Sequence, residues 1–188
     1  MNFEIEAPID RDTAVCTIRR GISADANALS AFAARTFSAT YGRYNDPGNL
    51  ARHIAGAFNA VRQGEELSDP DVACLLAHRD DALAGYAQVR RGETPACVTD
   101  AAPIELHRFY IDAAWHGCGL AQSLLDEART AALAFGGSVL WLKVWEHNAR
   151  AIAFYAKSRF IDVGTADFFV GSDRQTDRVL VLSLADRA

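Results

Sequence analysis

A six-residue loop with two glycines carries the clearest chemical signal in the sequence. It reads His116-Gly117-Cys118-Gly119-Leu120-Ala121 and is followed by Gln122. An apolar, strand-like run precedes it, and a segment with helical spacing of apolar residues follows it. Unpaired N–H groups and the positive end of the helix dipole meet at such a junction, and glycines let the backbone approach an anion closely. The loop is therefore a candidate binding site for a phosphate or a pyrophosphate.

Two well-known phosphate loops fit this stretch poorly. A dinucleotide-binding loop would have a third glycine at the position of Gln122 and an acidic residue at the end of the next strand, for which the sequence offers no good candidate. A P-loop would have a lysine followed by serine or threonine, and that pair is absent. The anion site must therefore be assigned from a longer stretch of sequence.

The elements that would position this loop are a strand over residues 104–111 and a helix over residues 120–135. Further strands are expected over residues 16–19, 72–78, 83–90, 139–145, 159–164 and 179–184. Further helices are expected from an N-cap at Ser23 to residue 42, from Pro47 to Phe58, and from a cap at Asn148 to residue 158. A turn is expected from Gly64 to Pro70. The order βααβββαβαββ predicts a mixed sheet with helices on both faces.

Length and composition indicate one domain over residues 1–188. Half of the 188 residues are apolar, enough for a substantial core, and no linker or repeat divides them. Residues 1–12 are acidic and lack the pattern of a signal peptide, and no apolar run approaches the roughly 18 residues of a membrane helix, so we expect a cytoplasmic protein without membrane contact. The net charge of -5 argues against nucleic acid as a partner. Four scattered cysteines favour free thiols over disulfides or zinc, and we expect no metal.

The loop and a second stretch together resemble a known superfamily. The pattern Q/R-x-x-G-x-G/A after a strand is typical of the acyl-CoA pyrophosphate loop of the GNAT superfamily of N-acetyltransferases. Residues 140–164 (L-W-L-K-V-W-E-H-N-A-R-A-I-A-F-Y-A-K-S-R-F-I-D-V-G) resemble the superfamily's A-x-x-F-Y signature. His116 departs from the loop pattern, which has Gln or Arg there.

This resemblance implies both a fold and a co-substrate. The fold class would be α/β (α+β), the GNAT acyl-CoA N-acyltransferase fold, with a mixed, mostly antiparallel sheet of about seven strands and helices on both faces. The co-substrate would be acetyl-CoA, which binds with its diphosphate at the glycine loop.

A narrower likeness concerns the two flanks of the chain. Residues 36–50 (T-F-S-A-T-Y-G-R-Y-N-D-P-G-N-L) and 168–177 (F-F-V-G-S-D-R-Q-T-D) are similar to segments of PaiA-like spermine/spermidine acetyltransferases. The likeness implies transfer of acetyl to a primary amine by direct attack, with a polyamine or another small-molecule amine as the acceptor. Two alternatives stay open: acetylation of a protein N-terminus or lysine, and a CoA-binding sensor without turnover. Exposed edge strands near the C-terminal end would allow a homodimer.

Two residues are candidates for catalysis. By resemblance, Tyr155 in A-x-x-F-Y is expected to protonate the CoA sulfur; the alternative is a tyrosine that only packs on the sheet. Glu105 is the candidate base, because an ammonium must lose a proton before it attacks. We expect it on the same strand face as Phe109 and Ile111, in a hydrophobic setting that raises its pKa toward neutrality. The alternative is a carboxylate paired with an arginine or with His107.

The residues expected to contact CoA follow from the same resemblance. An N–H near Tyr110 or Ile111 would bind the reaction's oxyanion, and Asn148 would contact the pantetheine arm while also capping a helix. Lys157 would reach the 3'-phosphate, with a solvated helix charge as the alternative. The full set comprises Phe109, Tyr110, Ile111, His116, Gly117, Cys118, Gly119, Leu120, Ala121, Gln122, Asn148 and Lys157.

Tyr41 and Asn45 are the residues expected to bind the acceptor. They lie at the first helix-helix turn, which borders the acceptor site in this superfamily; the alternative is aromatic packing beneath a turn. The Cys118 side chain is expected to face solvent and is assigned no chemistry. His107 and His116 are expected to be hydrogen-bonded residues without a catalytic role.

Overall fold

The sheet at the centre of the structure contains seven strands in the order β1-β2-β3-β4-β5-β7-β6. The computed structural model describes residues 16–185, and the acidic segment 1–12, on which the prediction about a signal peptide rests, lies outside them. All neighbouring strands are antiparallel except β4 and β5, which are parallel. The strands are β1 (Cys16–Arg20), β2 (Val72–Arg79), β3 (Ala82–Arg90), β4 (Pro103–Ile111), β5 (Val139–Trp145), β6 (Ile161–Val170) and β7 (Asp173–Ser183). The expected mixed, mostly antiparallel sheet is confirmed.

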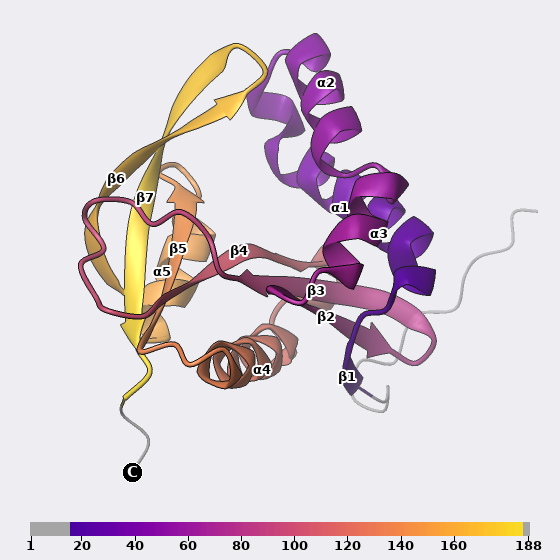
Figure 1. The fold of residues 1–188 in the computed structure, drawn as a ribbon. Helices are drawn as coiled ribbons and strands as arrows, with labels where there is room; N and C mark the ends of the chain where they lie inside the picture. Colours follow the sequence, from indigo (N-terminus) through magenta and orange to yellow (C-terminus); the bar gives the residue numbers. More distant parts are fainter. Residues whose placement is uncertain (1–15, 186–188) are drawn as a thin grey trace, which may run out of the picture.

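Helices cover both faces of the sheet, as predicted (Figure 1). One face, called the α1 face below, carries α1 (Ala26–Tyr41), α2 (Pro47–Ala57) and α3 (Ala60–Ser68). There Phe32 and Phe37 of α1 are buried with Tyr86 of β3. The opposite face, called the α4 face, carries α4 (Leu120–Ala134) and α5 (Ala149–Lys157). There Leu124 of α4 and Leu142 of β5 belong to the larger core.

Side-chain caps fix where the second and third helices begin. Asp46 accepts a hydrogen bond of 2.9 Å from the Asn49 N–H, and Pro47 is the first helical residue, so α2 begins where predicted. The sequence reading missed α3, because Gly64 suggested a turn. Asn59 caps this helix by accepting a hydrogen bond of 2.9 Å from the Arg62 N–H.

The start of α1 differs from the prediction. Ser23 is not the N-cap of a helix; it opens a 3-10 turn over Ser23–Asp25, and α1 follows at Ala26. The Asp25 carboxylate, which would otherwise be free to cap α1, accepts hydrogen bonds from the Arg19 guanidinium at 2.7 Å and from the Ile22 N–H at 2.9 Å. The Asp25 carboxylate therefore stabilises the 3-10 turn and does not cap α1.

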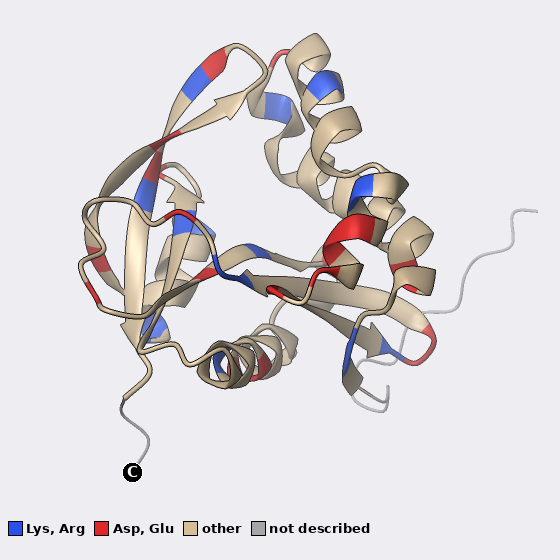
Figure 2. Cartoon of the chain, in the orientation of Figure 1, with Lys and Arg blue, Asp and Glu red and all other residues tan. Residues whose placement is uncertain are grey.

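The β6–β7 hairpin is longer than the sequence predicts. Its strands cover residues 161–170 and 173–183, so the motif at residues 168–177 forms the end of the hairpin. Both signs of charge lie along this hairpin (Figure 2), and Arg174 pairs with Asp167 at 2.9 Å. The hairpin extends far enough to bring β7 side chains into the site described below.

Strand β4 contains one extra residue relative to β3. Gln88 of β3 pairs with Arg108, whereas the next β3 residue, Val89, pairs with Leu106, so His107 forms a β-bulge. A bulge shifts the alternation of side chains by one residue. As a consequence, Leu106 and Phe109 both contribute to the core on the α4 face.

The pairing between β4 and β5 is short. It covers three residue pairs and ends where Glu105 of β4 faces Trp141 of β5. Beyond that pair, the remaining residues of β4 and β5 do not pair with each other. The parallel strands therefore separate immediately before the bulge, beside the loop that enters α4.

Candidate active site

The glycine loop enters α4 with both glycines in the left-handed region. Gly117 has φ 81° and Gly119 has φ 83°, and an added Cβ would meet no atom within 4 Å at either position. The backbone conformation, not crowding, therefore calls for glycine. In the described part of the chain, the N–H groups of residues 117–121 donate no hydrogen bond, whereas the Gln122 N–H donates to the Gly119 carbonyl at 3.0 Å. Free donors at a helix N-terminus fit the diphosphate of CoA.

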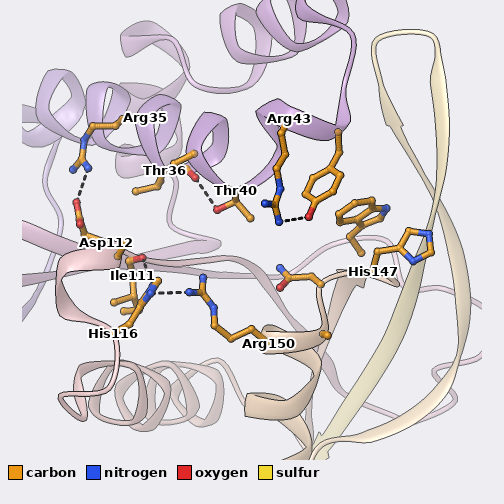
Figure 3. A pocket seen from close by; sticks show the side chains of 15 residues that line it. Arg35, Thr36, Thr40, Arg43, Ile111, Asp112, His116, His147 and Arg150 are labelled. Atoms are coloured by element: carbon orange, nitrogen blue, oxygen red, sulfur yellow. Dashed lines mark hydrogen bonds and ion pairs between the residues drawn. The ribbon is translucent and has the colours of Figure 1, made fainter.

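His116 is hydrogen-bonded through both ring nitrogens (Figure 3). Its Nε2 lies 3.1 Å from the Ile111 carbonyl oxygen, and its Nδ1 lies 2.7 Å from a guanidinium nitrogen of Arg150. Because a guanidinium only donates, Nδ1 accepts and Nε2–H donates to the carbonyl. His116 thereby holds a cation beside the loop. Sequence reasoning missed Arg150, although it lies within the motif at residues 140–164.

The other loop side chains contribute less than the backbone. The Cys118 thiol donates to the Trp115 carbonyl at 2.9 Å and packs against the core, so the expectation that it faces solvent is wrong. Leu120 is buried in the core, which leaves only its N–H for a ligand. The exposed Gln122 side chain lies 3.4 Å from Asp126.

A cavity of about 240 Å³, called the first cavity below, lies where β4 and β5 separate. It brings together many of the residues expected at the CoA site. Its lining includes Tyr41, Phe109, Tyr110, Ile111, His116, Gly117, Ala121, Asn148, Arg150 and Tyr155. It adjoins a wider opening of about 560 Å³, with which it shares His116, Asn148 and Arg150. Figure 3 shows His116 and Arg150 in this opening. Lys157 is exposed in the last turn of α5 and does not line the first cavity.

Tyr155 packs on the sheet and also lines the first cavity. Its ring makes edge contacts with Phe109, Phe154 and Phe160, at centroid distances of 6.3, 5.4 and 5.3 Å. Burial raises the pKa of Tyr155 above its ordinary value of 10, and the Tyr41 phenol raises it further. The Tyr155 hydroxyl is therefore protonated at neutral pH, as a proton donor must be.

Asn148 and Tyr41 connect α5 with α1. The Asn148 side chain accepts a hydrogen bond of 3.2 Å from the Ala151 N–H, so it caps α5 as predicted. It also interacts with the Tyr41 hydroxyl, whose pKa is raised by burial and lowered in part by this hydrogen bond. Asn45 donates to the Tyr41 carbonyl at 2.8 Å and accepts from the Gln175 side chain at 2.8 Å. Asn45 therefore links the end of α1 to β7.

Glu105 is buried, and both reasons for expecting a base there are wrong. The bulge places it on the face of β4 opposite to Phe109 and Ile111. Its carboxylate accepts a hydrogen bond of 2.6 Å from Arg90 Nε and lies 3.3 Å from Nδ1 of His107. Burial alone would raise the pKa of Glu105, but the hydrogen bond with His107 and the charges of His107 and Arg90 outweigh it and lower the pKa to about 2. Because burial lowers the pKa of His107 itself, Arg90 is the main cation at neutral pH.

A second cavity, of about 100 Å³, lies on the α1 face of the sheet. It shares Tyr41 and Tyr110 with the first cavity, so these two side chains stand between the two spaces. Its walls are largely aromatic, with carboxylates from β4 and β7. The lining residues are Phe37, Tyr41, Glu105, His107, Tyr110, Lys143, Trp145, Phe168, Val170, Gln175 and Asp177.

Asp177 of β7 is a site residue that sequence reasoning missed. It is 6% exposed, and its Oδ1 is buried without a hydrogen-bond partner. Burial raises the pKa of Asp177 to about 6, against the opposing effect of the Lys143 charge. The alternation of Asp177 with Val179 and Val181 was an available signal, because it places the carboxylate on an inward-facing position of the strand.

No helix within residues 16–185 is long and apolar enough to cross a bilayer. No group of three or more His, Cys, Asp or Glu side chains in that range is arranged to hold a metal ion.

Comparison with known proteins gives one family and a set of relatives. Residues 36–160 match the family model described as the acetyltransferase (GNAT) family. The chain is similar to an uncharacterised N-acetyltransferase of Mycobacterium tuberculosis, with 34% identity over 160 residues, which are 85% of this chain and 98% of that protein. It is also similar to an uncharacterised N-acetyltransferase of Lactobacillus delbrueckii subsp. lactis, with 30% identity over 82% of this chain and 89% of that protein.

Solved structures share the fold at lower identity. PaiA N-acetyltransferase from Thermoplasma acidophilum in complex with coenzyme A superposes with a TM-score of 0.72 at 20% identity, over 90% of this chain and 99% of that chain. The structure of yncA from Salmonella typhimurium with acetyl-CoA gives a TM-score of 0.61 at 18% identity, over 92% of this chain and 96% of that chain. The predicted fold is thereby confirmed.

Proposed function

Because the chain belongs to the GNAT family of acetyltransferases and is an acetyl-CoA-dependent N-acetyltransferase, we propose that its acceptor is a small primary amine, with a polyamine as the first candidate. One observation carries the proposal. Two cavities meet at Tyr41 and Tyr110, one beside the glycine loop and the other on the α1 face. A donor in the first cavity and an amine in the second would meet at these two side chains.

The donor's diphosphate is assigned to the free N–H groups of residues 117–121 and to Arg150. The family's loop pattern has Gln or Arg at the position that His116 occupies here. Arg150, which is hydrogen-bonded to His116, supplies a cation beside that position. The pantetheine arm is assigned to the first cavity, beside Asn148 and the end of β4. Acetyl-CoA, when bound, supplies an acetyl group activated as a thioester. Lys157 stays a candidate for the 3'-phosphate.

Two groups of this chain are proposed to handle charge during transfer. The backbone N–H of Tyr110 or Ile111, at the end of β4 that lacks pairing with β5, would stabilise negative charge on the acetyl oxygen. The Tyr155 hydroxyl would donate its proton to the departing sulfur. Tyr41 would support both steps by keeping the Asn148 side chain in place at the first cavity.

The second cavity supports a slim amine as the acceptor. Its volume of about 100 Å³ suits an alkylamine end, and its aromatic walls suit an ammonium group through cation–π attraction. The Asp177 carboxylate adds negative charge to the same space, whereas the charge of Glu105 is balanced by Arg90. The PaiA-like motifs at residues 36–50 and 168–177 make spermine and spermidine the first acceptors to test.

An acceptor screen with acetyl-CoA tests this proposal by following thiol release. The panel contains spermine, spermidine, n-propylamine, and short peptides with a free N-terminus or an internal lysine. Turnover of the small amines in preference to the peptides is the expected result. Turnover of peptides alone would refute the small-amine acceptor, and tight CoA binding without turnover of any acceptor would favour a sensor.

A further inference from the structure

Two carboxylates are buried in the described part of the chain, and only one of them is paired. Glu105 has Arg90 and His107 as partners. The side-chain carboxylate of Asp177, a residue that is 6% exposed, makes no hydrogen bond or ion pair with any other described residue, and its Oδ1 is buried without a partner. Burying a charge without a partner is strongly unfavourable unless the group becomes neutral or meets a ligand. A buried carboxylate that lines a cavity therefore indicates a missing cation.

The charged and titratable groups around Asp177 do not fully compensate the charge of its carboxylate. They come from α1, β4, β5 and the turn after β5, and comprise Tyr41, Glu105, His107, Tyr110, Lys143 and Glu146. Lys143 lowers the pKa of Asp177 and Glu146 raises it, but burial has the largest effect. Lys143 is itself exposed, so its ammonium remains solvated.

We propose that Asp177 binds the ammonium group of the acceptor amine in the second cavity and takes the proton that must leave before the nitrogen attacks. This rests on the proposed function, in which the second cavity receives the amine. It also replaces Glu105 as the base, because the Glu105 carboxylate is already engaged by Arg90 at 2.6 Å. Asp177 touches the substrate in this role and is therefore a catalytic residue.

The proton balance of the step is complete. One proton passes from the ammonium to the Asp177 carboxylate and then to solvent. The nitrogen forms a bond to the acetyl carbon and loses a second proton to solvent, while the carbon–sulfur bond breaks. The sulfur takes a proton from Tyr155, and solvent restores the Tyr155 hydroxyl. The products are the amide, free CoA and one proton.

The position of Asp177 also defines the class of acceptor. Trp145 of β5 is its register partner, and Phe37, Tyr41, Tyr110 and Phe168 also belong to the aromatic lining. A primary ammonium between a carboxylate and aromatic rings is held by charge and by cation–π attraction. Acceptors that are cationic at neutral pH should therefore depend on Asp177 much more than uncharged nucleophiles.

The test compares Asp177→Asn with Asp167→Asn, an exposed carboxylate of β6 that pairs with Arg174. The two probes are n-propylamine, which is cationic at pH 7.5, and hydroxylamine, which is largely uncharged there and needs no base. We expect Asp177→Asn to lower kcat/KM for n-propylamine roughly 100- to 10,000-fold and to affect hydroxylamine far less. Asp167→Asn should match the wild type with both probes. Equal losses with both probes, or no loss with n-propylamine, would overturn the proposal.

A second readout does not need turnover. In protein carrying 13C-labelled aspartate carboxyls, Asp177 should titrate near pH 6, and its signal is identified by its absence in Asp177→Asn. Saturating n-propylamine in the presence of CoA should move this titration to lower pH by at least one pH unit. An unchanged titration would refute amine binding at Asp177 even if thiol release proceeds. If no small amine of the acceptor panel releases thiol from acetyl-CoA, the proposed function fails while the titration still decides the binding claim.

Discussion

Replacing Asp177 with Asn should stabilise the folded protein while impairing amine acetylation. The pKa of Asp177 is about 6 in the folded chain, against an ordinary value of 3.8. Asp177 therefore ionises less readily in the folded state than in the unfolded chain. At pH 7, a pKa difference of about two units between the two states corresponds to about 3 kcal/mol of lost stability. Because an asparagine amide in the same place also lacks partners, the expected net gain is about 1 to 3 kcal/mol.

The sign of the pH dependence distinguishes this explanation from a general packing effect. A raised carboxylate pKa destabilises the fold above pH 6, and the cost disappears as the pH falls from about 6 to 3.8. Urea unfolding of wild type, Asp177→Asn and the control Asp167→Asn should be measured at pH 7.5, 6.5, 5.5 and 4.5. The gain in Asp177→Asn should be largest at pH 7.5 and shrink toward pH 4.5. A gain that does not vary with pH, or a wild type that is the more stable protein at pH 7.5, would refute the reasoning.

Three further predictions follow from other parts of the site. Glu105→Gln should lower the free energy of unfolding by about 3 kcal/mol at pH 7 in urea titrations, and the loss should vanish between pH 4.5 and about 2, because pairing depresses this pKa. Tyr155→Phe should lower kcat for thiol release roughly 100-fold or more with little change in KM for acetyl-CoA. Gly119→Ala should cost about 1 to 2 kcal/mol at φ 83° and weaken CoA binding in calorimetry, whereas Gly56→Ala at an exposed position of α2 should be neutral or stabilising.

Local patterns in the sequence predicted the elements around the glycine loop. The strand before it, the loop itself and the helix after it each depend on residues close together in the chain, so their spacing is visible without a structure. The capping role of Asn148 is local in the same way. By contrast, α3 was missed because its nine residues carry little apolar surface and include Gly64, and contacts with α1 and β2 stabilise it.

The errors at the site come from relations between distant segments. The pKa expected for Glu105 depended on its neighbours, and Arg90 reaches it from β3 only once the sheet has formed. Asp177 lies 72 residues beyond Glu105 in the chain, and although the alternation along β7 places it inward, only the folded sheet shows that its carboxylate has no partner. Arg150 was overlooked because its link to His116 spans 34 residues.

The bulge at His107 connects most of these features. A bulge bends its strand and increases the local twist, and here the parallel pairing of β4 with β5 ends at Glu105, two residues before it. The separation of the strands and the shift in alternation therefore occur at the same place. The shift sends Phe109 to the α4 face and Tyr110 to the α1 face, where Glu105 also lies, so that the end of β4 lines the first cavity while Tyr110 reaches the second. Without the extra residue, one regular alternation would run along the whole of β4. Glu105 would then lie on the same face as Phe109, as its spacing in the sequence suggests.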